Sequence, residues 1–320
     1  MTKIVRFSQL SHPRENNPAR VSLEPALMGG VVSIGNFDGV HIGHRVLLSE
    51  AKKQADAIGG PTVAIVFDPH PSAILRADFV PEKLTWIERR AELMGELDIE
   101  YLLVIETTES FLSLSAKDFF QSLIVDNLRA KAMIEGPNFF FGRGRQGNVE
   151  TLAQLCQENQ ILCTIAHPTE NGDELISSTR IRDLLGQGKI ANALQFLGSP
   201  YRIRGQVVTG EKRGRTIGFP TANLSGFDVV IPGHGVYGGT ANIGEKRFLA
   251  AIHIGPNPTF NESASKVEVH LLDFSGDLYG QQISVDFELA VRDVTRFEST
   301  KDLAAQLTRD VAVIRNQLLL

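Results

Sequence analysis

Short apolar segments alternate with amphipathic segments along the first 190 residues. The apolar segments are rich in β-branched residues, as expected of buried strands, and lie at 31–35, 62–67, 101–105, 131–136 and 161–166. Helix-spaced apolar positions indicate helices between them, at 44–59, 83–98, 115–128 and 148–160. This alternation predicts a parallel sheet with helices on both faces, a doubly wound α/β domain. Such sheets bind ligands at the carboxyl ends of their strands.

The pattern changes after residue 200. Strand-like segments now follow one another, separated by turns rich in glycine and proline, at 201–210, 235–243, 247–255, 266–274 and 281–289. This arrangement is typical of an antiparallel barrel or sandwich. A final helix is expected over 298–320, with one apolar stripe formed by Leu303, Leu307, Val311 and Ile314. We therefore expect two domains, 1–190 and 191–320.

Composition narrows the class of protein. The chain has 320 residues, 42% of them hydrophobic, and a net charge of −5, which argues against sequence-independent binding of nucleic acid. It has no apolar run long enough to span a membrane, and its first residues lack the apolar core of a secretory signal. Cys156 and Cys163 are too few for a disulfide framework or a zinc site. We expect a cytoplasmic protein with no nucleic-acid or membrane partner.

The segment GNFDGVHIGH, residues 35–44, joins the first apolar strand to the first helix. Gly35 and Gly39 permit close approach of the backbone to a ligand, and the free N–H groups of a helix start favour phosphate. His41 and His44 are three residues apart and share one helical face. Both could donate hydrogen bonds to a triphosphate and become positive as charge builds on a leaving pyrophosphate. The spacing alone equally fits two surface histidines.

A second candidate segment is ISSTRIRDLL, residues 176–185. Its hydroxyl side chains precede a helix, where they can cap it and face an anion, and its arginines are suited to phosphate. The residues are Ser177, Ser178, Thr179 and Arg182. The alternative is an ordinary helix cap with solvated arginines. Together with HIGH, the segment resembles the HIGH-motif nucleotidyltransferase superfamily, whose members transfer AMP from ATP and release pyrophosphate.

The segment GPNFFFGRGRQGN, residues 136–148, contains the spacing G-x-G-x-x-G. Its glycines are separated from the preceding strand by PNFFF, so we reject a dinucleotide site of the NAD type. The segment instead resembles the GxDFxFG motif of one nucleotidyltransferase family. Asn138 stands where that family more often has the aspartate that meets the nucleotide.

The second half carries GQVVTGEKRGRTIGFPTANL, residues 205–224. Its glycine-flanked basic loop could close over phosphates and comprises Gly210, Lys212, Arg213, Gly214 and Arg215. Thr221 and Asn223 fall on one face if the segment is extended, and their neutral oxygens suit Mg²⁺ when a nucleotide supplies the charge. Further on, in VEVHLLDF, Glu268 and His270 alternate with apolar residues.

The order of HIGH, GxxFxFG, SSTxxR, GRxxGFPTAN and VEVHLLDF resembles the bacterial bifunctional riboflavin kinase/FAD synthetase family, over roughly residues 20 to 315. The resemblance implies a Rossmann-like FMN adenylyltransferase domain followed by a riboflavin kinase barrel with a terminal helix. The barrel would phosphorylate riboflavin to FMN, and the first domain would join AMP to FMN to give FAD and pyrophosphate. Both steps use ATP, with Mg²⁺ as the implied cofactor.

The same resemblance implies roles for individual residues. Glu268 would be the general base for the riboflavin hydroxyl, and His41, His44 and Arg182 would act on the triphosphate during adenylyl transfer. The first turn would bind nucleotide through Gly35, Phe37, Asp38 and Gly39. Pro69 and Pro71, in FDPHP, match a stretch near the flavin, although prolines there could equally just end a strand. Glu106-Thr107 departs from the aromatic-acidic pair that is usual in the family.

Three other functions share part of this pattern. A single-function adenylyltransferase would need an inactive kinase site, yet Thr221, Asn223 and Glu268 are all present. An aminoacyl-tRNA synthetase also has HIGH, but this acidic chain has no KMSKS-like loop. A non-catalytic flavin sensor would bind flavin without consuming ATP. The sequence does not indicate an oligomeric state.

Overall fold

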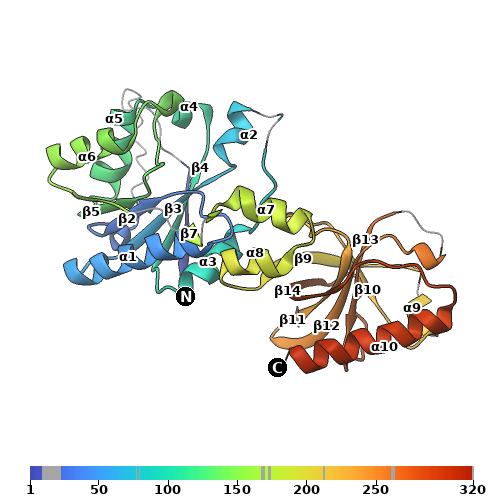
Figure 1. Cartoon of the computed structure of the whole chain (residues 1–320). Coiled ribbons are helices and arrows are strands. Elements are labelled where there is room, and N and C mark those ends of the chain that lie inside the picture. The colour runs from blue at the N-terminus through green and yellow to red at the C-terminus, as the bar shows by residue number, and fades with distance from the viewer. Residues whose placement is uncertain are drawn as a thin grey trace. The chain divides into compact units, whose positions relative to one another are not determined.

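The computed structural model describes residues 1–8, 23–76, 78, 80–166, 170–171, 174–211, 213–260 and 264–318. The chain divides into two compact units, Met1–Pro81 with Trp86–Ile176, and Glu82–Thr85 with Ser177–Leu320 (Figure 1). This division falls before Ser177, whereas the sequence suggested 190/191 for the domain boundary. Where the functional domains meet stays a prediction.

The first unit is built on a parallel sheet, as the sequence predicted. Over the described residues it has six strands in the order β1-β4-β3-β2-β5-β6. They are β1 (Lys3–Phe7), β2 (Val31–Ile34), β3 (Thr62–Asp68), β4 (Tyr101–Glu106), β5 (Ala132–Glu135) and β6 (Leu162–Ile165). The edge strand β1, which pairs with β4, was not predicted. A separate small hairpin is formed by β7 (Glu170–Asn171) and β8 (Glu174–Leu175).

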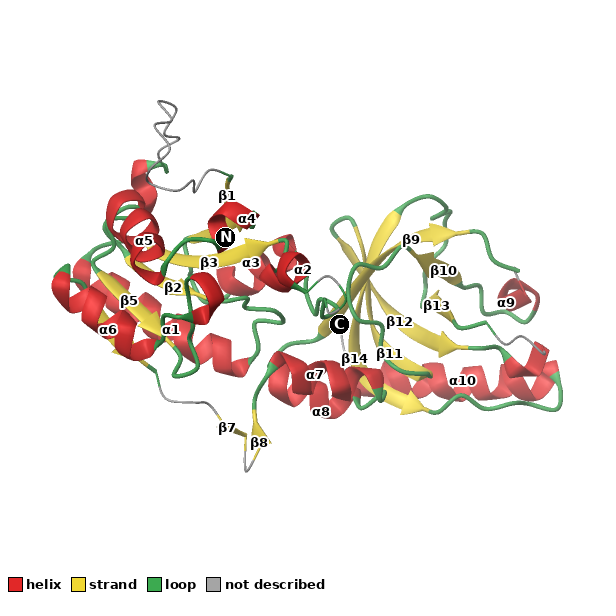
Figure 2. Cartoon of the chain, turned by 90° about the horizontal axis from the view of Figure 1, so that it is seen from above, coloured by secondary structure: helices red, strands yellow, loops and turns green. Residues whose placement is uncertain are grey.

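Helices connect these strands (Figures 1 and 2). They are η1 (Pro25–Leu27), α1 (Ile42–Ile58), α2 (Pro71–Leu75), α3 (Ile87–Gly95), α4 (Glu109–Leu112), α5 (Ala116–Phe119), η2 (Phe120–Asn127), η3 (Arg143–Arg145) and α6 (Val149–Glu158). The helix expected over 115–128 continues from α5 into the π-helix η2.

The helix expected over 83–98 begins only at Ile87. The residues before it are used differently, because Glu82 and Lys83 belong to the second unit and their carbonyl groups accept hydrogen bonds within it. The donors are the Arg182 guanidinium at 2.6 Å and the Val230 amide at 2.8 Å. A tertiary role for these carbonyls thus replaces the first helical turn.

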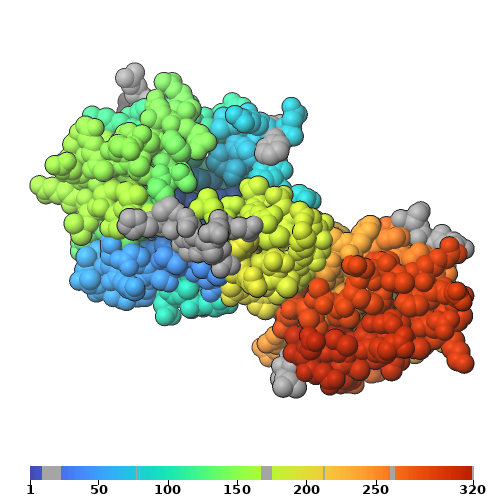
Figure 3. Space-filling model, viewed as in Figure 1, coloured from blue at the N-terminus to red at the C-terminus, as the bar shows by residue number. Residues whose placement is uncertain are grey.

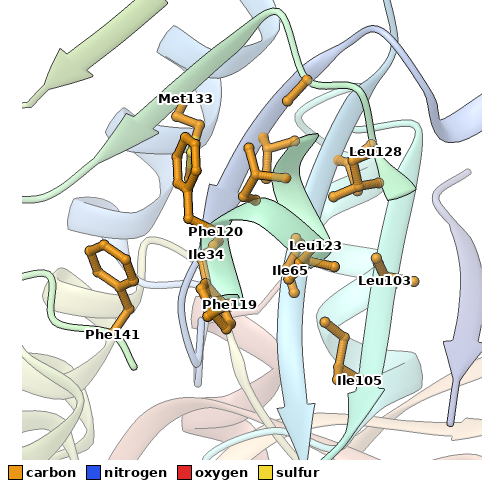
Figure 4. Packing of buried hydrophobic residues seen from close by; sticks show 14 of the residues in the cluster. Ile34, Ile65, Leu103, Ile105, Phe119, Phe120, Leu123, Leu128, Met133 and Phe141 are labelled. Atoms are coloured by element: carbon orange, nitrogen blue, oxygen red, sulfur yellow. The ribbon is translucent and has the colours of Figure 1, made fainter. Parts of the chain in front are cut away.

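Each face of the sheet has its own apolar core. Phe119, Phe120 and Leu123 pack against Ile34 and Ile65 on one face (Figure 4). On the other face, α1 and α3 contribute buried residues, among them Leu48, Ala51, Ala91 and Met94. Helices on both faces make the domain doubly wound, as expected.

The second unit is a closed antiparallel barrel with the strand order β10-β13-β12-β11-β14-β9. Its strands are β9 (Tyr201–Val208), β10 (Ala222–Ser225), β11 (Gly235–Ile243), β12 (Lys246–Gly255), β13 (Lys266–Leu271) and β14 (Gln282–Arg292). Because the sheet is closed, the unit is a barrel and not the sandwich that the sequence pattern also allowed. The short β10, which contains Asn223, completes the ring although its residues are largely polar.

Helices flank the barrel. They are α7 (Ser178–Gly186), α8 (Ile190–Leu197), α9 (Arg213–Thr216), η4 (Pro258–Phe260) and α10 (Thr300–Gln317). The terminal helix α10, red in Figure 3, covers one side of the second unit. The fully buried Ile314 and the ion pair between Arg292 and Asp310, at 2.9 Å, fasten this helix to the barrel.

Candidate active sites

The segment GNFDGVHIGH forms a tight turn from β2 into α1. The Gly35 amide donates to the Ile65 carbonyl at 3.0 Å, and the chain then turns through positive φ angles at Phe37, Gly39 and Val40. Two of these residues are not glycine, so the turn holds backbone conformations that L-residues seldom adopt. The turn lies at the carboxyl end of β2, where ligands of parallel sheets bind.

His41 and His44 lie together at the start of α1. His41 is the N-cap, and its Nδ1 accepts a hydrogen bond of 3.3 Å from the His44 amide. The two imidazole rings stack with centroids 3.6 Å apart, which confirms that they share one face. The Phe37 ring meets His44 edge-on at 5.3 Å. His44 Nδ1 is buried and has no hydrogen-bond partner among the described residues.

Burial keeps both imidazoles uncharged in the free protein. It lowers the pKa of His41 to about 4, against an opposing effect of Asp38. Burial also lowers the pKa of His44 well below its ordinary value, and the nearby His41 and Arg90 add to this effect. Burial thus disfavours a positive charge on these rings, and a bound anion would favour it.

Asp38 and Arg90 form a buried ion pair beneath the turn. The Arg90 guanidinium lies 3.0 Å from the Asp38 carboxylate and also donates to the Asn36 carbonyl at 3.1 Å. Both side chains are almost fully buried. This pair ties the turn to α3, and Arg90 is a residue that sequence reasoning missed. The expected contact of Asp38 with nucleotide stays a prediction.

The other residues expected to bind ligands in this unit lie shortly after the ends of β3 and β5. Asn138 is exposed in the turn after β5. Pro69 follows β3 directly, and its carbonyl accepts a hydrogen bond of 2.6 Å from the Thr107 hydroxyl. Pro71 is the first residue of α2. The prolines thus stand at the end of a strand and the start of a helix, and their flavin contact stays a prediction.

Five phenylalanine rings form a continuous row in the first unit. Neighbouring ring centroids are 5.4, 5.8, 5.8 and 5.4 Å apart, in the order Phe67, Phe111, Phe119, Phe141 and Phe139. Both ends of the row are only partly buried. Sequence reasoning did not find this row, although FFF at 139–141 was a visible signal.

The serine-rich segment caps α7 in the second unit. The Ser177 hydroxyl accepts a hydrogen bond of 3.2 Å from the Arg180 amide, and Ser178 and Thr179 lie in the first helical turn. Arg182 reaches the Glu82 carbonyl. The cap was predicted and is confirmed. Joint action of this segment with His41 and His44 stays a prediction.

In the barrel, polar side chains from three strands stand in one row. Glu268 on β13 is paired with Asn223 on β10 and with His253 on β12. Directly opposed residues on neighbouring strands point to the same face of a sheet. All three line a cavity of about 120 Å³. Sequence reasoning found Glu268 and Asn223 but missed His253, which lies on an otherwise apolar strand.

Asn257 fixes the Glu268 carboxylate. Its side-chain amide donates a hydrogen bond of 3.0 Å to one Glu268 oxygen. Asn257 comes from the loop after β12 and lines the same cavity. His253 also faces this loop, with its Nε2 3.3 Å from the Pro256 carbonyl, and burial lowers the pKa of His253. The carboxylate is therefore oriented by a residue that its own strand does not supply.

The FPTAN segment is held close to the basic loop. His270 donates from Nδ1 to the Pro220 carbonyl at 2.8 Å. A Cβ atom at Gly210 would overlap the Asn223 amide, and one at Gly214 would overlap the Phe219 carbonyl. Both glycines are thus required for close packing. Lys212, the remaining basic residue predicted in this loop, lies outside the described residues.

A second cavity, of about 520 Å³, adjoins the first. Thr221 lines both cavities. Arg213 and Gly214 line the smaller cavity, whereas Arg215 lines the larger one together with Tyr279. The basic loop therefore contributes to two adjoining cavities with Thr221 at their shared wall.

The apolar stripe of α10 contributes to the smaller cavity. Leu303, Leu307 and Val311 line it, while the fourth residue of the predicted stripe, Ile314, packs in the core. An apolar wall thus faces the polar row that contains Glu268. Such a cavity suits a ligand with a large apolar ring and a polar tail.

The described part of the chain lacks two kinds of feature. No group of three or more His, Cys, Asp or Glu side chains there could hold a metal ion. No helix there is long and apolar enough to cross a membrane.

Comparison with known proteins matches both halves. Residues 24–180 match the family model of FAD synthetase, and residues 197–318 match that of riboflavin kinase. Bifunctional riboflavin kinase/FMN adenylyltransferase of Escherichia coli K12 is 37% identical over 90% of this chain and 92% of its own. The Listeria monocytogenes and Bacillus subtilis proteins of the same name are 35% and 34% identical, each over 88% of this chain and 90% of their own.

A solved structure, the macrolide-efflux protein from Streptococcus pneumoniae, has the same fold. Its TM-score is 0.84 at 31% identity, over 98% of this chain and 99% of that one. The two family matches favour a bifunctional enzyme over a single-function adenylyltransferase, a tRNA synthetase or a flavin sensor. The chain therefore belongs to the bifunctional riboflavin kinase/FMN adenylyltransferases, transferases that phosphorylate riboflavin and adenylylate FMN with ATP as co-substrate.

Proposed function

We propose that riboflavin is phosphorylated in the barrel cavity, with Glu268 as general base, and that FMN is adenylylated at the turn containing His41 and His44. One observation supports the first assignment: Glu268 lies between Asn223 and His253 in a cavity that shares the lining residue Thr221 with a second cavity. Two adjoining cavities suit a reaction between two bound substrates.

For the kinase reaction, riboflavin occupies the smaller cavity with its ring against the apolar face of α10. Glu268 takes the proton of the ribityl 5′-hydroxyl as that oxygen attacks the γ-phosphorus of ATP. The bond from the γ-phosphorus to the bridging oxygen breaks, and ADP leaves. Asn257 keeps one carboxylate oxygen engaged, so the other oxygen of Glu268 is the one that receives the proton.

ATP occupies the larger cavity, with its phosphates directed toward Thr221. Arg215 lines that cavity, and Arg213 lines the cavity of the acceptor. Guanidinium groups on both sides of the transferred phosphoryl group suit the charge that develops on it. Gly210 and Gly214 would bind nucleotide through their backbone amides.

Thr221 and Asn223 are the residues that would hold Mg²⁺. Their side chains supply neutral oxygens, and the close packing of Gly210 and Gly214 keeps these side chains beside the phosphate loop. When bound, Mg²⁺ neutralises charge on the ATP phosphates. The two protein oxygens match the few ligands that Mg²⁺ takes from a protein.

For adenylyl transfer, an FMN phosphate oxygen attacks the α-phosphorus of ATP, and the bond to the β-phosphate oxygen breaks to release pyrophosphate. No protein nucleophile is needed, so catalysis consists of alignment and charge stabilisation. Neutral His41 and His44 donate N–H groups to the phosphates, while the start of α1 supplies free backbone amides. Ser177, Ser178, Thr179 and Arg182 would bind the outer phosphates.

The flavin of FMN would lie at the row of phenylalanine rings. Phe67 ends this row and leads into the segment with Pro69 and Pro71, while Phe139 at the other end follows Asn138. A planar ring system gains from offset or edge contacts with such rings. The pair Glu106-Thr107 supplies no aromatic ring, which leaves this contact to the phenylalanines.

We propose the cytoplasm as the site of action. Both cysteines are free thiols, as is usual in a reducing compartment. Cell fractionation followed by assay of riboflavin phosphorylation tests this. Activity in the membrane or extracellular fraction would contradict it.

One incubation tests whether the protein catalyses both reactions and in which order. Purified protein is given riboflavin, ATP and Mg²⁺, and flavins are separated by chromatography over time. FMN should appear first and FAD should follow. Omitting Mg²⁺ and adding a chelator should stop FMN formation, and formation at an unchanged rate would contradict the metal assignment.

A further inference from the structure

The strands β2 and β5 separate before their carboxyl ends. Their pairing stops at Val32 and Met133. Beyond that point β2 remains paired with β3 as far as Ile34, and β5 remains paired with β6 as far as Glu135. Among the described residues, the end of β2, directly before the Gly35–His44 turn, thus has no strand partner on the side of β5.

A side chain takes the place of that missing partner. The carboxyl group of Glu135 accepts a hydrogen bond of 2.7 Å from the Ile34 amide. The next amide, that of Gly35, points to the opposite side and donates to the Ile65 carbonyl. The two successive amides at the start of the turn are therefore held from opposite sides, that of Ile34 by the Glu135 side chain and that of Gly35 by the Ile65 carbonyl.

The environment of Glu135 favours its uncharged form. The side chain is 1% exposed, and no basic group forms an ion pair with it among the described residues. Burial raises the pKa of Glu135 well above its ordinary value, the neighbouring Cys163 raises it further, and the Ile34 amide opposes this. An uncharged carboxyl can support a phosphate site, whereas a carboxylate at the same place would repel the phosphates.

We propose that Glu135 is a positioning residue for FMN adenylylation, which holds the Ile34 amide and thereby sets the geometry of the Gly35–His44 turn for ATP. This inference rests on the proposed location of ATP at that turn. Glu135 acts through the Ile34 backbone and contacts no reacting atom. Its loss therefore weakens ATP binding more than it slows the chemical step.

Steady-state kinetics of Glu135→Val and Glu135→Gln test the proposal. The valine variant leaves a buried amide without an acceptor, so its KM for ATP in FMN adenylylation should rise about tenfold while kcat changes little. The glutamine variant keeps an uncharged acceptor and should have an unchanged KM. Riboflavin phosphorylation by the same chain serves as the internal control of folding and concentration, and should be unaffected in both variants.

Each outcome of these assays supports or contradicts the proposal. A normal KM for ATP in Glu135→Val overturns the proposal. If KM rises as much in Glu135→Gln as in Glu135→Val, an uncharged acceptor is not sufficient, and the inference that Glu135 acts in its uncharged form is overturned. If Glu135→Val loses both activities or does not fold, Glu135→Asp replaces it: this acid is one methylene too short to reach Ile34, and a normal KM would overturn the proposal. His44→Ala is assayed in parallel. Undiminished FAD synthesis in that variant would instead show that the location of ATP is wrong.

Discussion

The side-chain amide of Asn257 donates a hydrogen bond of 3.0 Å to the carboxylate of Glu268, and both residues line the barrel cavity. Asn257→Ala removes this donor and frees the carboxylate to rotate. We expect kcat of riboflavin phosphorylation to fall about tenfold to a hundredfold, the range for a hydrogen bond to a charged group. FAD synthesis from added FMN should not change. A kinase kcat equal to that of the wild type would mean that Asn257 does not orient Glu268.

Glu268→Gln removes the proposed base with little change in volume. We expect riboflavin phosphorylation to fall by about 10² to 10⁴. FMN adenylylation, assayed with added FMN, should continue at the wild-type rate. Glu288→Gln on β14 is the control, since Glu288 is bonded to Thr240 and does not line the cavity. Loss of kinase activity in both variants would indicate damage to the barrel rather than loss of a base.

His44→Ala should leave FMN formation intact and lower FAD synthesis by about 10² to 10³, the effect of removing one preorganised donor. Val46→Ala is the matched control, because Val46 is exposed on the same helix. Both reactions are followed in one chromatographic assay. Equal loss of the two activities in His44→Ala would refute the assignment of this turn to adenylyl transfer alone.

Gly210→Ala should abolish riboflavin phosphorylation, because its Cβ would displace the Asn223 amide. Gly186→Ala is the control, since a Cβ there meets no atom within 4 Å. Thermal unfolding should be similar for the two variants, because Gly210 lies in a loop. Full kinase activity in Gly210→Ala would show that the position of the Asn223 side chain does not matter.

The depressed pKa of His41 makes the protein sensitive to acid. The unfolded chain binds a proton below about pH 6.5, whereas folded His41 does so only near pH 4, so stability is lost as the pH falls through this window. At pH 5 the free energy of unfolding should be about 2 kcal/mol lower than at pH 7 because of this residue. His41→Asn keeps an N-cap acceptor without a titrating ring. Its free energy of unfolding, measured with urea, should therefore fall less between pH 7 and pH 5 than that of the wild type. Parallel curves for the two proteins would contradict this.

The apolar runs predicted the buried strands well because hydrophobicity is a local property. Strand β1 escaped prediction because it is a half-buried edge strand, and β10 because its residues are polar. The expected pairing of His41 with His44 followed from helical spacing alone. Three supporting residues, Arg90, Glu135 and Asn257, could not be predicted in the same way. Asp38 and Ile34 lie 52 and 101 residues from their partners, and Glu268 lies on a different element from Asn257, so only the folded chain brings each pair together.

The segment Glu82–Thr85 has a consequence for dividing the enzyme. It is encoded inside the first half, yet its carbonyl groups serve Arg182 and Val230 of the second unit. During translation this segment is synthesised well before Arg182 and Val230. Its carbonyl groups can therefore form these hydrogen bonds only after the second unit has been made. An isolated fragment that begins at Ser177 would lack them altogether. The second unit is therefore not contiguous in sequence, and a fragment that reproduces it would have to include Glu82–Thr85.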